Sequence, residues 1–484
     1  MKNMTILELH NALLAGTITP KDLLDQTIAA AKADNNNAFE YIMEKEAYEA
    51  LAALDQKDKN NLMWGIPFVI KDNFSTKDVP TTASSDILNG YCPIYNSTVY
   101  ERLLAAGAIP VGKTTLDELA LGGTGMSGHL GYTYNPWDKS HKHLVGGSSA
   151  GSAACVAAGF VPLGIGSDTG DSVRKPASFA GLVGFKPTWG RISRYGLFPF
   201  ATSLDHVAYF TRSVEDAALI LSLIAGKDVN DCTASEKPVE DYLGNLNGDL
   251  TGKKIAIIKE IFESLTNKEV KDAFLKHIEE IKAKGATVDF VSMDINLCKA
   301  ILPTYVVISC AEATSNDANL DGIKFGPRAK GDTYEEVVMN NRTENFSALI
   351  KRRFIIGGYS LMKENQDILF KRAQKCRRLI VDTVNNILKD YDGIYLPAAP
   401  DTAPTFDASG ADKLSNEYLI ADNHMAIGNF GGFPSITVPF IIKNGMPIGA
   451  NLTGKIFDEQ NVLNIAFGIE KTTGYKNLLP KEGK

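Results

Sequence analysis

The sequence lacks the features that mark nucleic-acid-binding, exported or disulfide-stabilised proteins. Its 50 Lys and Arg residues are outnumbered by 57 Asp and Glu, and the formal charge of -7 gives no net positive field for phosphate backbones. Six cysteines without CxxC or ladder spacing predict free thiols in a reducing cytoplasm. The start, MKNMTILELHNALL, has neither the basic head nor the apolar run of a signal peptide, so none is expected.

A long run of bulky apolar side chains is also missing. Residues 144–167 contain no Asp, Glu, Lys or Arg and are long enough to span a bilayer. Their many glycines and serines and Pro162 leave too little bulky apolar surface for a transmembrane helix. We therefore expect buried, polar-lined backbone here and no membrane association.

Several familiar motifs are absent or incomplete. No G-x-x-x-x-G-K-[ST] loop occurs, so ATP is not expected to bind this chain. The G-x-G-x-x-G match at 123–128 has no strand running into it and no helix directly after it, unlike a dinucleotide site. Asp168-Thr169-Gly170 resembles an aspartic-protease triplet but has no second copy to share a proton. His141 and His143 flank a lysine in a polar loop and the other five histidines have no ligand spacing, so no metal is expected.

What is present is an alternation of short apolar runs with helical periodicity. This pattern predicts an α/β fold with a mostly parallel or mixed sheet covered by helices. The expected strands are 66–70, 108–112, 161–165, 254–258, 287–291, 393–397 and 435–440, and the expected helices are 98–106, 213–225, 268–284, 345–364, 366–390 and 459–471. Residues 1–60 are expected to be helical. No linker divides the chain, so we expect one large domain over 1–484.

A serine-rich segment, GGSSAGSAA at 146–154, carries two alternative nucleophiles. Ser149 fits G-x-S-x-G, but a nucleophile elbow needs a strand directly before it, and DKSHKHLVG is polar and basic. The second interpretation pairs Ser148 with Ser172. A helix over about 149–158 would lead away from Ser148, and strand 161–165 would return toward it. The loops around Ser148 and Ser172 could then meet.

Ser172 is expected where a loop enters a short helix. Backbone N–H groups are unpaired at such a position and can stabilise an oxyanion, which points to Thr169, Gly170 and Asp171. The candidate base is Lys71, carried into the interior at the end of an apolar run, because burial lowers the pKa of a lysine. The residues alone leave open that Lys71 pairs with Asp72 and that the serines only cap helices.

Three motifs resemble the amidase signature family: GIPFVIKDN, VGGSSAGSAA and GSDTGDSVRKPASFAGLVGFKPTWGRIS. The resemblance implies a Ser-cisSer-Lys triad in which Lys71 is the terminal base, Ser148 the bridging serine and Ser172 the nucleophile. It also implies one compact domain with a central mixed sheet between helical layers. The expected organisation is a helical segment over 1–60, a signature core over 61–230, and the substrate pocket with the remaining sheet over 231–484.

Further motifs resemble one branch of that family, the glutamine-hydrolysing subunits of tRNA-dependent amidotransferases. They are Pro303-Thr304-Tyr305, AEATSN at 311–316, LDGI at 320–323, KRR at 351–353 and PIG at 447–449. By this resemblance Arg353 would bind the carboxylate of glutamine, Asp422 would bind its amino group, and Tyr305 would line the pocket. A free amino acid presents one anion and one cation, so a partner for each is chemically sensible.

Two departures from the family pattern concern the site. Asp171 stands where relatives usually have Gly, so its carboxylate must point outward or cap the following helix to spare the developing negative charge. Gly125 and Met126 stand where that branch commonly has a Thr-Glu pair. This chain therefore lacks the glutamate that could activate or relay ammonia at that position.

The function implied by the resemblance is glutamine hydrolysis in the cytoplasm, with ammonia passed on to convert Glu-tRNA(Gln) to Gln-tRNA(Gln). The implied partners are a larger subunit that binds ATP, Mg and tRNA, and a small accessory subunit. This chain itself would need no cofactor. The alternatives are a standalone amidase acting on a small amide, and a scaffold subunit in which Asp171 has disabled the oxyanion hole.

Overall fold

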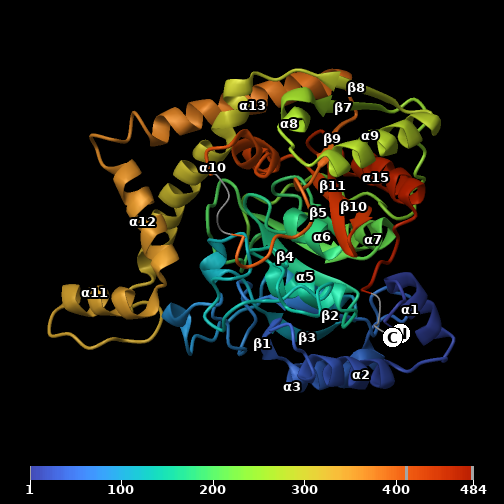
Figure 1. Cartoon of the computed structure of the whole chain (residues 1–484). Helices are drawn as coiled ribbons and strands as arrows, with labels where there is room; N and C mark the ends of the chain where they lie inside the picture. The colour runs from blue at the N-terminus through green and yellow to red at the C-terminus, as the bar shows by residue number, and fades with distance from the viewer. Residues whose placement is uncertain (1, 409–412, 481–484) are drawn as a thin grey trace.

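A single mixed β-sheet runs through the chain in the computed structural model, which describes residues 2–408 and 413–480 (Figure 1). Its 11 strands lie in the spatial order β1-β3-β2-β4-β6-β5-β10-β11-β9-β7-β8. The strands are β1 (Phe39–Ile42), β2 (Pro67–Lys71), β3 (Ile109–Thr114), β4 (Leu163–Asp168), β5 (Val183–Lys186), β6 (His206–Thr211), β7 (Lys254–Ile258), β8 (Thr287–Val291), β9 (Gly393–Pro397), β10 (Ser435–Lys443) and β11 (Met446–Thr453).

Both strand directions occur in this sheet. β2 pairs in parallel with β3 and β4, and β7 pairs in parallel with β8 and β9, while the other neighbours are antiparallel. The middle strands are buried along their whole length, as expected for a sheet covered on both faces. The expectation of one α/β domain with a central mixed sheet is therefore confirmed.

Helices cover the sheet and extend beyond it. They are α1 (Ile6–Leu14), α2 (Pro20–Lys32), α3 (Glu44–Ala52), α4 (Thr98–Ala105), α5 (Ala150–Ala157), α6 (Arg174–Ala180), α7 (Val214–Ile224), α8 (Lys259–Glu263), α9 (Lys268–Ala283), α10 (Ile295–Asn316), α11 (Tyr334–Asn345), α12 (Ala348–Leu361), α13 (Phe370–Asp390), α14 (Ala426–Phe430) and α15 (Glu459–Thr473). Short turns of helix are η1 (Leu54–Gln56), η2 (Asp86–Leu88), η3 (Glu118–Ala120), η4 (Asp317–Asn319) and the π-helix η5 (Glu417–Ala421).

All seven predicted strands are present, three of them with the predicted bounds and the others shifted or extended by a few residues. Four strands escaped prediction: β1, β5, β6 and β11. β1 also makes the expected all-helical character of residues 1–60 wrong in this detail. β11, MPIGANLT, is rich in residues that are poor strand formers, and its burial between β10 and β9 decides its conformation.

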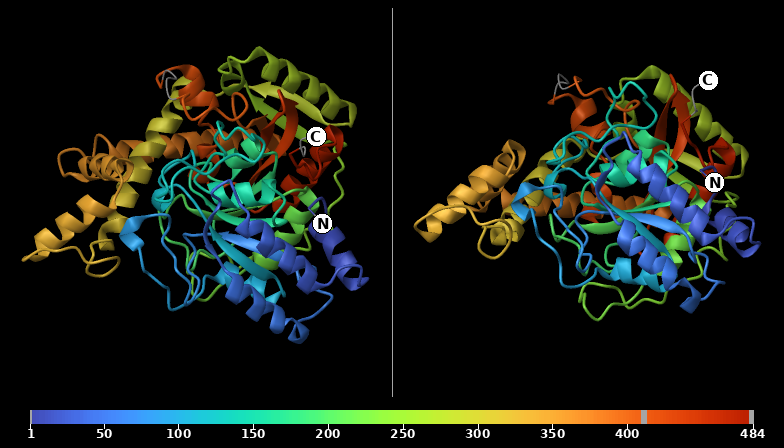
Figure 2. Two further views of the ribbon diagram at one scale, coloured as in Figure 1. Left: turned by 60° about the horizontal axis from the view of Figure 1, so that its bottom comes forward. Right: turned by 90° about the horizontal axis from the view of Figure 1, so that it is seen from below.

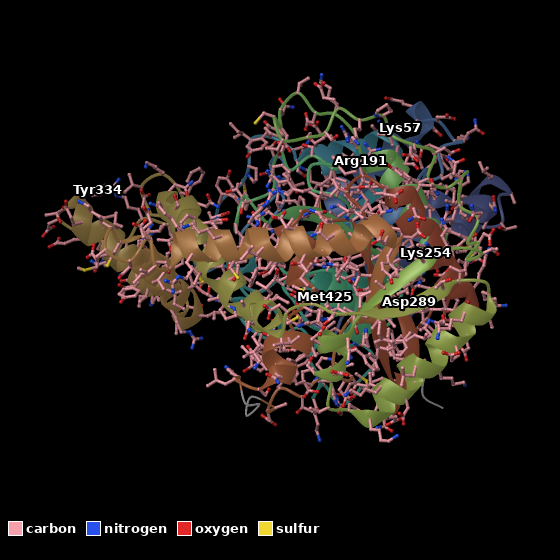
Figure 3. The ribbon with its side chains drawn as sticks, turned by 90° about the horizontal axis from the view of Figure 1, so that it is seen from above. Lys57, Arg191, Lys254, Asp289, Tyr334 and Met425 are labelled. Atoms are coloured by element: carbon pink, nitrogen blue, oxygen red, sulfur yellow. The ribbon has the colours of Figure 1, made fainter. Side chains whose placement is uncertain are left out.

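The predicted helices begin or end within a few residues of α4, α7, α9, α12, α13 and α15. The 22-residue helix α10 was missed because Pro303 interrupts its pattern, although the helix continues through it. α11 and α12 project from the body as an arm in all the views of Figures 1 and 2. Figure 3 has Tyr334 at the outer end of this arm, far from Met425 in the body.

One helical stretch in the described part of the chain, Ile295–Asn319, is long and apolar enough to cross a membrane by length and composition alone. This is weak evidence, because a core helix of a soluble protein passes the same test. Here 44% of its apolar window is buried inside the protein. The segment 144–167 instead folds as a loop, α5 and the buried strand β4.

Candidate active site

Lys71 is the last residue of β2, a strand in the middle of the sheet, and its side chain is fully buried. Its Nζ lies 2.7 Å from Ser148 Oγ and 2.9 Å from Ser167 Oγ, and it forms no ion pair with any described residue. Asp72 instead pairs with Lys113 at 3.0 Å, so the alternative pairing of Lys71 with Asp72 does not occur. Burial lowers the pKa of Lys71 to about 7, despite opposing fields from Asp117 and Asp168.

Ser148 follows a cis peptide bond, Gly147-Ser148, in the loop before α5. Asp117 N–H donates to Ser148 O at 3.1 Å, and the Asp117 carboxylate accepts hydrogen bonds from the backbone N–H groups of the adjoining loop 124–127 and from the Ser127 hydroxyl. Gly147 N–H donates to Gly123 O at 3.1 Å. A Cβ at Gly147 would lie 2.1 Å from Asp117 Oδ2, so only glycine fits there. The 123–128 motif therefore supports the Ser148 loop.

Ser172 lies in the turn between β4 and α6, and its residue surface is 3% exposed. Ser149 N–H donates to Ser172 O at 3.2 Å, so the two serine loops adjoin as the predicted helix-and-strand path requires. Within the described residues, the Ser172 hydroxyl makes no hydrogen bond, and the N–H groups of Gly170 and Asp171 donate none. Unpaired donors beside an uncommitted hydroxyl are the arrangement that acyl transfer to serine needs.

A buried ion pair fixes the backbone next to Ser172. Arg174 Nη2 lies 2.8 Å from Asp168 Oδ1 and also donates to Gly170 O at 2.8 Å. Because a trans peptide points its C=O and N–H in opposite directions, the Asp171 N–H faces away from Arg174. Asn429 Nδ2 donates to Asp168 O at 2.9 Å, which ties this turn to α14. Burial alone would raise the pKa of Asp168, but Arg174 lowers it below its ordinary value.

Asp171 forms an ion pair with Lys175, four residues later on α6, at 2.9 Å. The sequence analysis expects this carboxylate to point outward or to cap the helix; its side chain is 19% exposed and has Lys175 as a cationic partner. Lys175 Nζ also lies 3.1 Å from Asp422 Oδ1 and donates to the Asp422 carbonyl. Asp422 follows η5, so this lysine links the segment after Ser172 to a residue 247 positions away in sequence.

Arg353 on α12 and Tyr305 on α10 are neighbours near the same turn. A Cβ at Gly170 would lie 2.9 Å from Tyr305 Cζ, so the tyrosine ring packs directly against the proposed oxyanion loop. Arg353 donates to Cys310 Sγ at 3.7 Å and has no carboxylate partner among the described residues. Burial raises the pKa of Tyr305. The nearby charge of Arg353 lowers this pKa and that of Asp171 raises it. A half-buried arginine without an acid is a candidate anion-binding group.

The structure also shows what the alternative candidates, Ser149 and the histidines, contact. No strand leads directly into Ser149, and the Ser149 hydroxyl donates to Ser167 O at 3.0 Å. Ser149 therefore lacks the geometry of a nucleophile elbow. His143 Nδ1 is 2.7 Å from Asp138 Oδ2 in a surface loop. Across residues 2–408 and 413–480, no group of three or more His, Cys, Asp or Glu side chains could hold a metal ion.

Sequence reasoning missed four residues that build the site: Asp117, Ser167, Asn429 and Lys175. Ser167 and Lys175 lie inside the quoted signature, but nothing in their spacing says which partner each one contacts. Asn429 comes from a segment more than 250 residues downstream of the triad motifs, so only the fold brings it to Asp168.

Comparison with known proteins matches residues 22–463 to the family model described as Amidase. The chain is 39% identical over 486 residues to the glutamyl-tRNA(Gln) amidotransferase A subunit of Latilactobacillus sakei, covering 99% of this chain and 98% of that one. The crystal structure of the glutamyl-tRNA(Gln) amidotransferase A subunit from Thermotoga maritima is 33% identical with a TM-score of 0.74, covering 95% and 97%. A peptide amidase in complex with chymostatin is 26% identical with a TM-score of 0.83, covering 99% of each chain.

The buried Lys71 amine predicts a pH profile for the reactivity of Ser172. Lys71 can accept a proton only when neutral, so Ser172 should lose about tenfold in reactivity per pH unit below about pH 7 and level off above it. The second-order rate of inactivation by a sulfonyl fluoride, measured from pH 5 to 9, reports this directly. A profile that is flat across pH 7 would show that Lys71 is not the base.

Proposed function

Because the chain belongs to the amidase family, we propose that it hydrolyses glutamine to glutamate and supplies the ammonia to a partner that converts Glu-tRNA(Gln) to Gln-tRNA(Gln). The observation that carries the chemistry is the 2.7 Å contact between the buried Lys71 amine and Ser148 Oγ. The substrate assignment rests on the similarity over nearly the whole chain to amidotransferase A subunits.

The proposed reaction begins with proton transfer through the two serines. Neutral Lys71 takes the proton of Ser148, Ser148 takes that of Ser172, and Ser172 Oγ attacks the amide carbon of glutamine. The negative charge on the former carbonyl oxygen is met by the N–H groups of the loop formed by Thr169, Gly170 and Asp171. The C–N bond then breaks, and the proton held by Lys71 returns through Ser148 to the leaving nitrogen, releasing ammonia.

The second half of the reaction regenerates the enzyme. Water attacks the glutamyl ester of Ser172 while the Lys71–Ser148 relay accepts its proton. Collapse of the second tetrahedral intermediate breaks the ester C–O bond, and the relay returns the proton to Ser172 Oγ. Glutamate leaves, and no metal, oxidant or nucleotide is consumed in this chain.

Three residues are proposed to recognise glutamine. Arg353, which has no acid partner among the described residues, would bind the α-carboxylate, and Tyr305 beside it would line the pocket. Asp422 would bind the α-amino group through the part of its carboxylate that Lys175 leaves open. Its side chain is 31% exposed, so a ligand can reach it.

Partner, cofactor and location complete the proposal. ATP and Mg would bind a larger subunit that also holds tRNA, a small accessory subunit would join the complex, and the assembly would work in the cytoplasm. The similarity to a peptide amidase keeps a standalone amidase as a second candidate. The ion pair of Asp171 with Lys175 argues against a disabled scaffold, because it engages the carboxylate that would oppose the oxyanion.

The triad is tested by single substitutions. Ser172→Ala should abolish glutamine hydrolysis and the acyl-enzyme, since no other group is placed to form the ester. Ser148→Ala and Lys71→Ala should each lower kcat by roughly a thousandfold or more because the three residues act as a unit. Ammonia release and mass spectrometry of the trapped ester provide the measurements. Ser149→Ala is the matched control, and activity lost only in that variant would favour the elbow mechanism.

Glutamine recognition is tested at Arg353. Arg353→Ala should raise the KM for glutamine far more than it lowers the turnover of a neutral amide, because the triad is untouched. Losing the partner of a buried carboxylate costs about 2–5 kcal/mol. Steady-state kinetics with glutamine and butanamide separate the two effects. Unchanged glutamine binding in both Arg353→Ala and Asp422→Ala would refute the substrate assignment.

Dependence on a partner separates the two candidate functions. Ammonia released into water is lost to biosynthesis, so a biosynthetic glutaminase should turn over slowly until its partner is loaded. We expect the isolated chain to be a weak glutaminase that is stimulated by a tRNA- and ATP-binding subunit, and to retain no tRNA at physiological salt. Ammonia release with and without the partner, ATP and glutamyl-tRNA measures the stimulation. A full rate from the chain alone would favour the standalone amidase.

A further inference from the structure

Three charged side chains meet beside the nucleophile: Asp171, Lys175 and Asp422. Lys175 Nζ lies 2.9 Å from Asp171 Oδ2 and 3.1 Å from Asp422 Oδ1, and it also donates to the Asp422 carbonyl. Two N–H donors of the Lys175 ammonium are engaged by Asp422, through its Oδ1 and its carbonyl, and the contact with Asp171 is an ion pair.

The net charge of this cluster is negative. Two carboxylates and one ammonium leave a single negative charge, the same as Asp422 alone would provide. The exposed fractions of the side chains are 19% for Asp171, 31% for Asp422 and 9% for Lys175, so Asp422 is the most accessible of the three. Burial raises the pKa of the Asp171 carboxyl, and the neighbouring Lys175 ammonium opposes that rise and favours the carboxylate. Burial alone would lower the pKa of Lys175, but the two carboxylates outweigh it and raise that pKa above its ordinary value, keeping the lysine charged.

The position of each member of the cluster matters for the reaction. Asp171 directly precedes Ser172, and its own N–H belongs to the proposed oxyanion loop. An unpaired carboxylate there would oppose the negative charge of the tetrahedral intermediate. Asp171 lies three residues before α6 begins and Lys175 lies in the first turn of that helix, where its N–H donates to Asp171 O at 2.9 Å, so the ammonium reaches the Asp171 carboxylate. A lone Lys175, in turn, would neutralise Asp422 and remove the attraction for an amino group.

We propose that Asp171 and Lys175 form a compensating pair. Lys175 holds the Asp171 carboxylate away from the oxyanion loop, and Asp171 restores the negative charge that Lys175 would otherwise remove from the amine site at Asp422. Both are positioning residues, since each acts through a neighbour. The amine-site half of this inference rests on the proposed function, whereas the oxyanion half requires only that Ser172 is the nucleophile.

Compensation predicts a different defect in each single variant and recovery of both properties in the double variant. Lys175→Gln keeps a donor for the Asp422 carbonyl but frees Asp171, so Ser172 reactivity should fall at least tenfold. Asp171→Asn leaves Lys175 paired only with Asp422, so amides that carry an amino group should bind at least tenfold more weakly. In D171N/K175Q the cluster again carries one negative charge, and both properties should return to within about threefold of the parent.

The experiment uses the full chain and four related amides. Glutamine carries both charged groups, 4-aminobutanamide lacks the carboxylate, glutaramate lacks the amino group, and butanamide lacks both. The rate of inactivation by a sulfonyl fluoride reports Ser172 reactivity, and the amide concentration that halves this rate reports binding without requiring turnover. Asp171→Asn should weaken the binding of glutamine and of 4-aminobutanamide. The ratio of the binding constants of glutaramate and butanamide should change little.

Controls separate compensation from a structural role. Lys21 and Asp25 form an exposed i,i+4 ion pair on α2, so K21Q, D25N and their double variant serve as the matched set. Thermal unfolding of each variant identifies loss of folding. Losses that simply add in D171N/K175Q, or a fully reactive Ser172 in Lys175→Gln, would overturn the inference. If the parent binds glutamine no better than butanamide, the proposed function is wrong, and the Ser172 reactivity of the double variant still decides the oxyanion half.

Discussion

The removal of the Lys71 side chain from water is the constraint on which the rest of the site depends. An ammonium group without a carboxylate partner is costly to bury, so burial favours the neutral amine and brings its pKa to about 7. The group can then accept a proton near neutral pH without a histidine. Its position at the end of a central parallel strand is what keeps water away, because both sheet faces there are covered.

Buried polar side chains fix the loops around the Lys71 amine. The Asp117 carboxylate accepts hydrogen bonds from the N–H groups of the loop that supports Ser148. The Asp168–Arg174 ion pair and Asn429 hold the turn that carries Ser172. Both acids are buried and fully engaged in hydrogen bonds, which is the condition under which buried polar groups specify one conformation. Fixed loops spare the enzyme from reorganising dipoles during the reaction, and this is the main source of electrostatic catalysis in such sites.

The sequence predicted those parts of the fold that depend on local patterns. β7, β8 and β9 are continuous apolar runs, and their bounds agree with the structure. β11 and α10 violate local preference, the first through glycine and asparagine and the second through Pro303, and tertiary packing decides both. The same division holds at the site. Lys71 could be proposed from its place after an apolar run, whereas Asn429 and Lys175 act through contacts between segments that the sequence does not connect.

The departure at Asp171 illustrates why a substitution near a nucleophile cannot be judged alone. Taken by itself, a carboxylate next to Ser172 argues for a damaged oxyanion hole. In the structure its charge is met by Lys175, four residues later, which also forms an ion pair with Asp422. Such balance requires the helix register of α6 and the approach of the segment after η5 together. An acid introduced at this position without the lysine would face the oxyanion unopposed, and the lysine without the acid would cancel the charge of Asp422. Under the proposed compensation, each of the two residues offsets the charge of the other.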